Sequence, residues 1–234
     1  MMTLTDVART YLPRRTLRGV QKALRRATDT VLGRAGRAAN PYATHVPVLV
    51  GLARVLNVER VIECGCGEYS TLTFLNRSAF PKLVDLLSLE NDREWFDNIA
   101  GRVGGDTRLE MVYVNGPMSL AASNIEIGGY DLVFLDDSMN LSERAATIKE
   151  VAAKRADSTV VVIHDYELAE YQRAAAAFTH RFKFDCLNPN TGVLWNNAPV
   201  AKPELRALNK LIKRHASRLQ PSDVDGWARA LTAR

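Results

Sequence analysis

The stretch VIECGCGEYS, residues 61–70, decides the fold of this 234-residue chain. It joins a short apolar run to an acidic residue, Glu63, and then to a turn with glycines at alternate positions, Gly65 and Gly67. Glycine lets a backbone pass close to a ligand, and a helix that begins after such a turn presents free N–H groups to a carboxylate. Glu63 is placed to accept hydrogen bonds from an ammonium group. These features predict a strand, a turn and a helix that together bind the head group of an amino acid.

Short runs rich in Val, Ile and Leu follow this turn and alternate with helical segments. The predicted strands are residues 60–62, 83–89, 108–114, 131–135, 159–163, 182–187 and 192–195, and the predicted helices are 71–76, 93–103, 118–123, 142–154, 167–178 and 203–219. This alternation is typical of βαβ units, and nearly continuous apolar strands are typical of parallel sheets. We therefore expect an α/β fold with a doubly wound, seven-stranded, mostly parallel sheet and an antiparallel last strand. Ligands of such sheets bind beyond the carboxyl ends of the strands.

Composition and charge are those of an ordinary globular protein with a basic N-terminal segment. Hydrophobic residues make up 47% of the chain and charged residues 24%. Residues 1–37 hold nine basic and two acidic residues, hence +7, which leaves −2 of the net +5 for the rest. The sequence shows neither an apolar run of about 18 residues nor a secretory signal, so we expect a cytoplasmic protein. Three cysteines at this spacing indicate reduced thiols without a metal or redox role.

We expect three units along the chain. Residues 1–39 form a basic amphipathic helical extension, residues 40–200 the core, and residues 201–234 a C-terminal helical extension. The apolar stripe of the first unit is expected to pack on the core or on a second subunit, and the second case would make a homodimer. Alternatively, the basic face of this unit contacts a membrane surface. An Arg-rich transit peptide is a further alternative. We do not expect a nucleic-acid partner.

Residues 61–70 resemble the first motif of the class I S-adenosylmethionine-dependent methyltransferases, an acidic residue followed by Gly-x-Gly. The resemblance extends over roughly residues 58–195, and it departs where the third glycine is replaced near Ser70, as in some small-molecule branches. It implies that Glu63, Gly65, Gly67 and Ser70 bind S-adenosylmethionine and that the chain is a methyltransferase with the Rossmann-like methyltransferase fold.

Two further residues are predicted to bind the cofactor's adenosine. Glu90 ends the predicted strand 83–89, 23 residues after Gly67, where a carboxylate accepts hydrogen bonds from both ribose hydroxyls, as in dinucleotide-binding folds. The resemblance implies that Asn115 contacts the adenine, although Asn-Gly-Pro is also an ordinary turn.

The ends of the fourth and fifth strands carry the residues predicted for catalysis. YDLVFLDD, residues 130–137, looks like the fourth-strand motif of the superfamily, which places Asp136 in the cofactor cleft. In members that need a divalent metal, the ligands come from these two strand ends, which implies Mg²⁺ or another divalent cation at Asp136 and Asp165. A hydroxyl acceptor needs a base or a metal because its pKa lies far above 7. His164, with an ordinary pKa of about 6.5, is the predicted base, and Asp136 or Asp165 is predicted to orient it or to bind the metal.

The segment before the first predicted strand begins with Asn40-Pro41, which predicts a helix start, although Pro47 can restart the helix. Segments in this position often cover the acceptor pocket of the resembled superfamily. We nevertheless interpret Tyr42 and His45 as surface or packing residues.

The sequence thus predicts an O-methyltransferase that acts on a small hydroxylated molecule, such as a sugar, a glycoside or another secondary metabolite. The chain lacks the Asn-Pro-Pro-Tyr sequence of many nucleic-acid amino-group methylases, which favours an oxygen acceptor. One alternative is an RNA or protein methyltransferase that uses the basic N-terminal helix. Another is an NAD-dependent oxidoreductase, which the missing final glycine and the absence of a Tyr-x-x-x-Lys pair disfavour. A binding module without catalysis is the last alternative.

Overall fold

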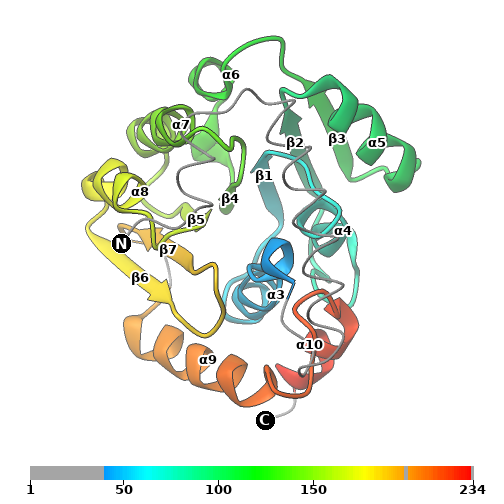
Figure 1. The fold of residues 1–234 in the computed structure, drawn as a ribbon, viewed down its shortest axis with the longest axis vertical. Helices are drawn as coiled ribbons and strands as arrows, with labels where there is room; N and C mark the ends of the chain where they lie inside the picture. The colour runs from blue at the N-terminus through cyan, green and yellow to red at the C-terminus, as the bar shows by residue number, and fades with distance from the viewer. Residues whose placement is uncertain (1–39, 198–199, 233–234) are drawn as a thin grey trace, which may run out of the picture.

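Seven strands form one sheet in the order β3-β2-β1-β4-β5-β7-β6 in the computed structural model of the chain (Figure 1). The structure describes residues 40–197 and 200–232. The strands are β1 (Arg60–Cys64), β2 (Asp85–Glu90), β3 (Leu109–Tyr113), β4 (Leu132–Leu135), β5 (Val160–His164), β6 (His180–Phe184) and β7 (Thr191–Trp195). The first five pair in parallel, and β7 is antiparallel to both β5 and β6. The predicted fold class is confirmed.

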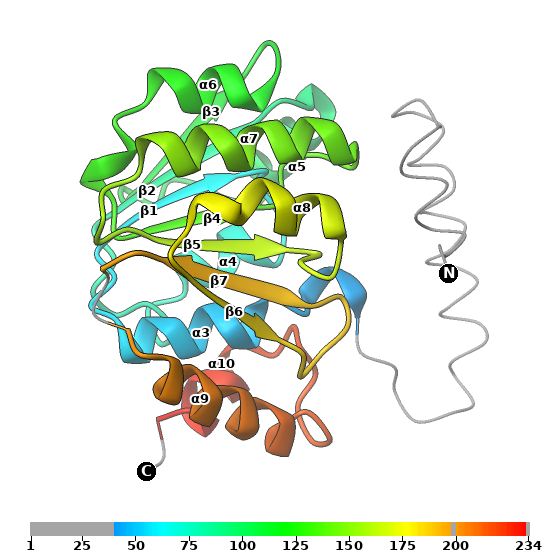
Figure 2. The same ribbon diagram turned by 90° about the vertical axis from the view of Figure 1, so that its left-hand side faces the viewer.

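Helices cover both faces of this sheet. They are α3 (Val46–Val55), α4 (Ser70–Leu75), α5 (Arg93–Val103), α6 (Met118–Asn124), α7 (Leu141–Lys154), α8 (Ala169–Ala174), α9 (Lys202–His215) and α10 (Val224–Ala230). Short 3₁₀ turns lie at Pro41–Ala43, Ile127–Gly129 and Ala175–Ala177. Figures 1 and 2 show α6, α7 and α8 together on one side of the sheet and α3, α9 and α10 together on the other.

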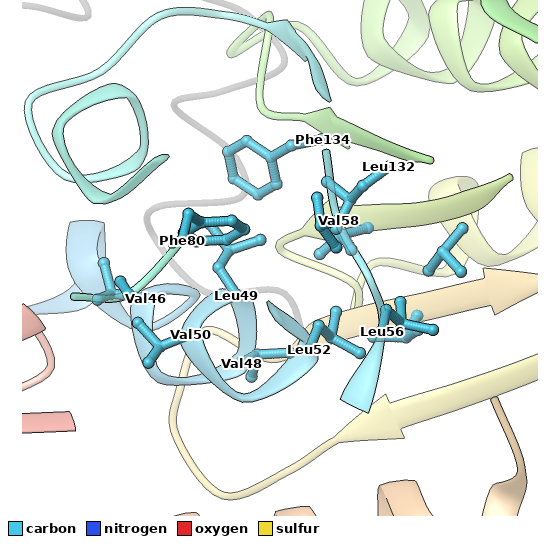
Figure 3. Close-up of a cluster of buried hydrophobic side chains, with 14 of the residues drawn as sticks. Val46, Val48, Leu49, Val50, Leu52, Leu56, Val58, Phe80, Leu132 and Phe134 are labelled. Atoms are coloured by element: carbon cyan, nitrogen blue, oxygen red, sulfur yellow. The ribbon is translucent and has the colours of Figure 1, made fainter. Parts of the chain in front are cut away.

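The first hydrophobic core lies between the sheet and α3. Figure 3 shows Leu49 and Leu52 of α3 among Phe80, Leu132 and Phe134, all of which are buried. Five buried residues of the C-terminal helices belong to the same cluster, namely Leu205, Leu208, Ile212, Trp227 and Ala228. The predicted C-terminal extension therefore shares its core with the sheet.

The second core fills the opposite face. It joins apolar residues of the strands to buried residues of α6, α7 and α8, among them Met118, Ile148 and Tyr171. Burial of the strands on both faces explains why they read as nearly continuous apolar runs. The strands therefore leave polar groups chiefly where they end.

The parallel register brings these strand ends to one edge. Glu63 pairs with Ser88 across β1 and β2, and Cys64 pairs with Leu135 across β1 and β4. Leu135 in turn pairs with Ile163, so the residues after β4 lie beside the end of β5. The polar residues predicted for cofactor binding and catalysis consequently gather at the carboxyl edge of the sheet.

A few elements differ from the prediction. The segment before β1 begins with a 3₁₀ turn capped by the Asn40 side chain. Helix α3 begins only at Val46, with Pro47 in its first turn. The hairpin register pairs His180 with Trp195, so β6 begins two residues earlier than predicted and residues 185–190 form the connecting loop. The short helix α10 was not predicted.

The predicted N-terminal helical extension, residues 1–39, lies outside the described residues. Within the described part of the chain, no helix combines the length and the apolar character that a membrane span requires.

Candidate functional site

The turn after β1 packs against the turn after β4. Gly65 has a φ of 93°, which side chains rarely adopt, and a Cβ there would lie 2.5 Å from the carbonyl oxygen of Asp136. The backbone N–H of Asp136 donates to the carbonyl oxygen of Cys64 at 2.9 Å. Backbone packing alone therefore requires glycine at position 65.

Helix α4 begins at Ser70, which is buried. The N–H of Gly67 donates to Oγ1 of Thr71 at 3.0 Å, which fixes the turn to the first residues of the helix. The Tyr69 hydroxyl accepts a hydrogen bond from Nδ2 of Asn40 at 2.7 Å. The predicted cofactor residues of this stretch thus share one strand–turn–helix junction, and Asn40 ties the segment before α3 to it.

Glu63 is fully buried near the end of β1. Its Oε2 accepts hydrogen bonds from Oγ1 of Thr71 at 2.6 Å and from Oγ of Ser88 at 2.5 Å. Its Oε1 is buried without a hydrogen-bond partner in the described chain. Burial raises the pKa of Glu63 to about 7, although the neighbouring hydroxyl groups lower it in part. A positively charged donor at Oε1 would offset the cost of ionising this carboxyl.

Glu90 ends β2 and faces the glycine turn. Its Oε1 accepts from the N–H of Asp92 at 2.7 Å, and its Oε2 lies 3.7 Å from the Sγ donor of Cys66. Burial raises the pKa of Glu90 to about 7. Nε1 of Trp95 donates to the carbonyl oxygen of Cys66 at 2.6 Å. The predicted adenine residue, Asn115, lies in an exposed position two residues after β3.

Asp136 and His164 form a hydrogen-bonded pair across the ends of β4 and β5. Oδ2 of Asp136 lies 3.2 Å from Nδ1 of His164, and Nε2 of His164 lies 3.0 Å from Oγ1 of Thr44. The Thr44 hydroxyl is also within 2.9 Å of the carbonyl oxygen of Pro189. Burial alone would lower the pKa of His164, but the carboxylates of Asp136 and Asp165 raise it to a net value above its ordinary 6.5.

His45 packs against this pair. Its ring is in edge contact with His164 and in tilted contact with Phe134, with centroids 4.8 Å apart in both cases. Both ring nitrogens are buried without a hydrogen-bond partner among the described residues. Burial and the charge of His164 lower the pKa of His45 to about 3, so the ring is neutral at ordinary pH. No local signal joins His45 to His164, because their two segments are about half the chain apart.

Arg144 of α7 completes the site, and it was not predicted from the sequence. Only 1% of this residue is exposed, and its guanidinium contacts Asp136 at 2.7 Å, Asp165 at 3.4 Å and Asp137 at 3.9 Å. Burial alone would raise the pKa of Asp136, but Arg144 and His164 lower it well below its ordinary range. Asp136 is therefore an ionised carboxylate with one oxygen on Arg144 and the other on His164.

The predicted metal pair, Asp136 and Asp165, lies against Arg144. A divalent cation such as Mg²⁺ or Ca²⁺ binds carboxylate oxygens at roughly 2.0–2.6 Å. Oδ1 of Asp136 and Oδ2 of Asp165 both contact the guanidinium of Arg144 instead. A cation held by these two carboxylates would have to displace a buried positive charge. The residues present do not fit a metal at Asp136 and Asp165.

Two cavities lie away from this site. One of about 360 Å³ is lined by residues 53–58 and 80–82, and one of about 460 Å³ by Arg54, Ser78 and residues near the end of α10. The first borders the residues that precede β1 and β2, at the amino edge of the sheet. Neither coincides with the strand ends that carry the predicted site.

No protein-family model and no curated protein sequence matches the chain. Human methyltransferase-like protein 13 in complex with SAH matches with a TM-score of 0.52 and 17% identity, over 75% of this chain and 93% of that chain. SAH-bound Podospora anserina methyltransferase PaMTH1 matches with a TM-score of 0.51 and 12% identity, over 80% of this chain and 99% of that chain. An O-methyltransferase family protein from Burkholderia thailandensis has a TM-score of 0.48 and 15% identity, over 68% of this chain and 56% of that chain. At these identities the similarity concerns the fold.

Burial of Glu63 predicts that the protein loses stability as the pH rises from about 4.5 to about 7. The pKa of Glu63 is about 7 in the folded protein against an ordinary 4.5, so the folded state binds this proton more tightly than the unfolded chain. The protonated Glu63 contributes up to about 3 kcal/mol to the free energy of unfolding. This contribution is complete below the pKa of the unfolded chain and is lost as the pH rises through the pKa of the folded protein.

Chemical denaturation of the wild type and of Glu63→Gln, at about pH 5 and about pH 8, measures this loss. The wild type should lose more stability than Glu63→Gln over this range. The control variant Glu110→Gln, at an exposed position of β3, should behave like the wild type. An equal loss in Glu63→Gln and the wild type would contradict the assignment.

Proposed function

Because the chain has the Rossmann-like fold of the class I S-adenosylmethionine-dependent methyltransferases, we propose that it transfers a methyl group from S-adenosylmethionine to a hydroxyl group of a small molecule. The observation that carries the proposal is the convergence of four acidic or basic strand-end residues at one edge of the sheet, namely Glu63, Glu90, Asp136 and His164. Sugars, glycosides and other secondary metabolites are the proposed acceptors.

The chain's own residues offer contacts for each part of the cofactor. Oε1 of Glu63, which has no hydrogen-bond partner among the described residues, is the proposed acceptor for the ammonium group. The turn from Gly65 to Gly67 and the start of α4 at Ser70 face the carboxylate, and Glu90 binds the ribose hydroxyls. Asn115 contacts the adenine in this proposal, since its exposed position leaves it accessible.

S-adenosylmethionine supplies a methyl group that is already activated, so the protein has to position the acceptor and remove its proton. Correct positioning contributes up to roughly 7 to 11 kcal/mol in favourable reactions. Asp136 is ionised and accepts the Nδ1 proton of His164, which leaves Nε2 as the atom that takes a proton. The Thr44 hydroxyl now lies at that atom, and it has the carbonyl oxygen of Pro189 as a second partner.

We propose that the acceptor hydroxyl takes the place of Thr44 at Nε2 of His164. Thr44 then keeps its hydrogen bond to Pro189, and no buried polar group is left without a partner. The predicted divalent cation is no part of this proposal, because the carboxylates predicted to hold it contact Arg144.

Calorimetric titration with S-adenosylhomocysteine tests the cofactor site. The wild type should bind the ligand, and Glu90→Gln should bind it about tenfold or more weakly, because a hydrogen bond to a charged group contributes about 1.5–3 kcal/mol. Glu110→Gln is the matched control and should bind normally. Absence of binding by the wild type, or binding of NADH instead, would contradict the proposal.

Substitution of His164 tests the proposed base. With an acceptor found by screening hydroxylated compounds, His164→Gln should lower turnover by roughly 10² to 10⁴, the usual contribution of a general base. The wild-type rate should rise with pH through a pKa above 6.5, as His164 loses its proton, and this rise should be absent from the variant.

The matched control is His180→Gln. His180 lies on β6, and its ring contacts that of Trp195 on β7. It should retain the wild-type rate and pH profile. Unchanged turnover of His164→Gln would remove His164 from the mechanism.

A further inference from the structure

Three carboxylates from two strand ends meet one guanidinium at the centre of this site. Nη2 of Arg144 lies 2.7 Å from Oδ1 of Asp136, Nη1 lies 3.4 Å from Oδ2 of Asp165, and Nε lies 3.9 Å from Oδ1 of Asp137. The ring of Tyr171 lies against the guanidinium, with its centroid 5.3 Å away. Arginine remains protonated in proteins, so this charge is permanent.

Arg144 and two of these carboxylates are almost completely buried. The Arg144 side chain is 2% exposed, and those of Asp137 and Asp165 are 1% and 5% exposed. Unpaired carboxylates in such surroundings are costly, and a buried charge persists only with a partner of opposite sign. Asp165 keeps its position with a φ of 58°, which a residue other than glycine rarely adopts. The chain therefore supplies one permanent positive charge beside these carboxylates.

A bound cation would have to compete with this guanidinium. At Asp136 and Asp165 it would need oxygens that already contact Arg144. A second candidate set is His45, Asp136 and His164, whose ligand atoms lie within 4.8 Å of one another. In that set a cation would have to displace the proton between Nδ1 of His164 and Asp136, with Arg144 still in contact with the same carboxylate.

We infer that Arg144 takes the place of a divalent cation in this site: its guanidinium contacts Asp136, Asp137 and Asp165, and it fixes Asp136 against His164. Arg144 is thus a positioning residue that acts through Asp136. The protein binds neither Mg²⁺ nor Mn²⁺ at these carboxylates. Only the consequence for turnover rests on the proposed function, since the absence of metal binding is measured without any methyl transfer.

Electron paramagnetic resonance of Mn²⁺ tests this inference on the full chain after treatment with EDTA. The wild type should leave added Mn²⁺ in the free form. Arg144→Met should gain one Mn²⁺ site, because it removes the positive charge that contacts the three carboxylates, and Asp165→Asn added to that variant should remove the site. Arg155→Met is the matched control, since Arg155 also lies against an aromatic ring, that of Phe178, and it should gain no site.

Stoichiometric Mn²⁺ binding by the wild type that disappears in Asp136→Asn or His45→Ala would overturn the inference, because it would locate a cation at these residues. A folded Arg144→Met that binds no Mn²⁺ would also overturn it. Should Arg144→Met fail to fold, the wild-type measurement still decides, and Arg144→Lys should fold and bind no Mn²⁺ because it retains the charge.

A turnover measurement adds an independent readout. EDTA should leave the wild-type rate unchanged, and a rate that requires added Mg²⁺ or Mn²⁺ would contradict the inference. Failure of the proposed function shows separately, as absence of S-adenosylhomocysteine binding in a protein that also leaves Mn²⁺ free.

Discussion

Asp136 makes the contacts on which the rest of the site depends. Its backbone joins the turn after β4 to the turn after β1, through the hydrogen bond to Cys64 and the close approach to Gly65. Its carboxylate binds Arg144 with one oxygen and His164 with the other. The residue therefore connects two turns, helix α7 and the end of β5. The orientation of the proposed base, His164, and the position of Arg144 both depend on Asp136.

Charge explains why these groups lie together. Removal of one partner from a buried ion pair typically costs about 3–5 kcal/mol, because the other charge is then left uncompensated. Arg144 supplies a positive charge to Asp136 and Asp165, and it lowers the pKa of Asp136 despite burial. The ionised Asp136 in turn raises the pKa of His164, while His45 beside it stays neutral. The pKa values of two imidazoles in ring contact are thus shifted in opposite directions.

Most of the fold could be predicted from the sequence because local patterns reflect it. Apolar runs mark strands buried on both faces, and the glycine turn marks the junction at Gly65. Contacts between distant segments left no such mark. Arg144 stands in SERAATIKE, where a charged residue is typical of a solvated helix face, yet it is buried. His45 likewise gave no sign that it meets His164. Helix α10 is short and contains Gly226, so neither its length nor its composition predicts a helix.

A crystal structure of the protein with S-adenosylhomocysteine would test the proposed cofactor site directly. We expect the ligand at the carboxyl edge of the sheet, with its ribose hydroxyls on the carboxylate of Glu90 and its amino-acid end at the turn of residues 65–70. Asp136 should remain bound to both Arg144 and His164. A ligand at another place on the molecule would rule out the proposed cofactor site, and a metal ion between Asp136 and Asp165 would rule out the role given to Arg144.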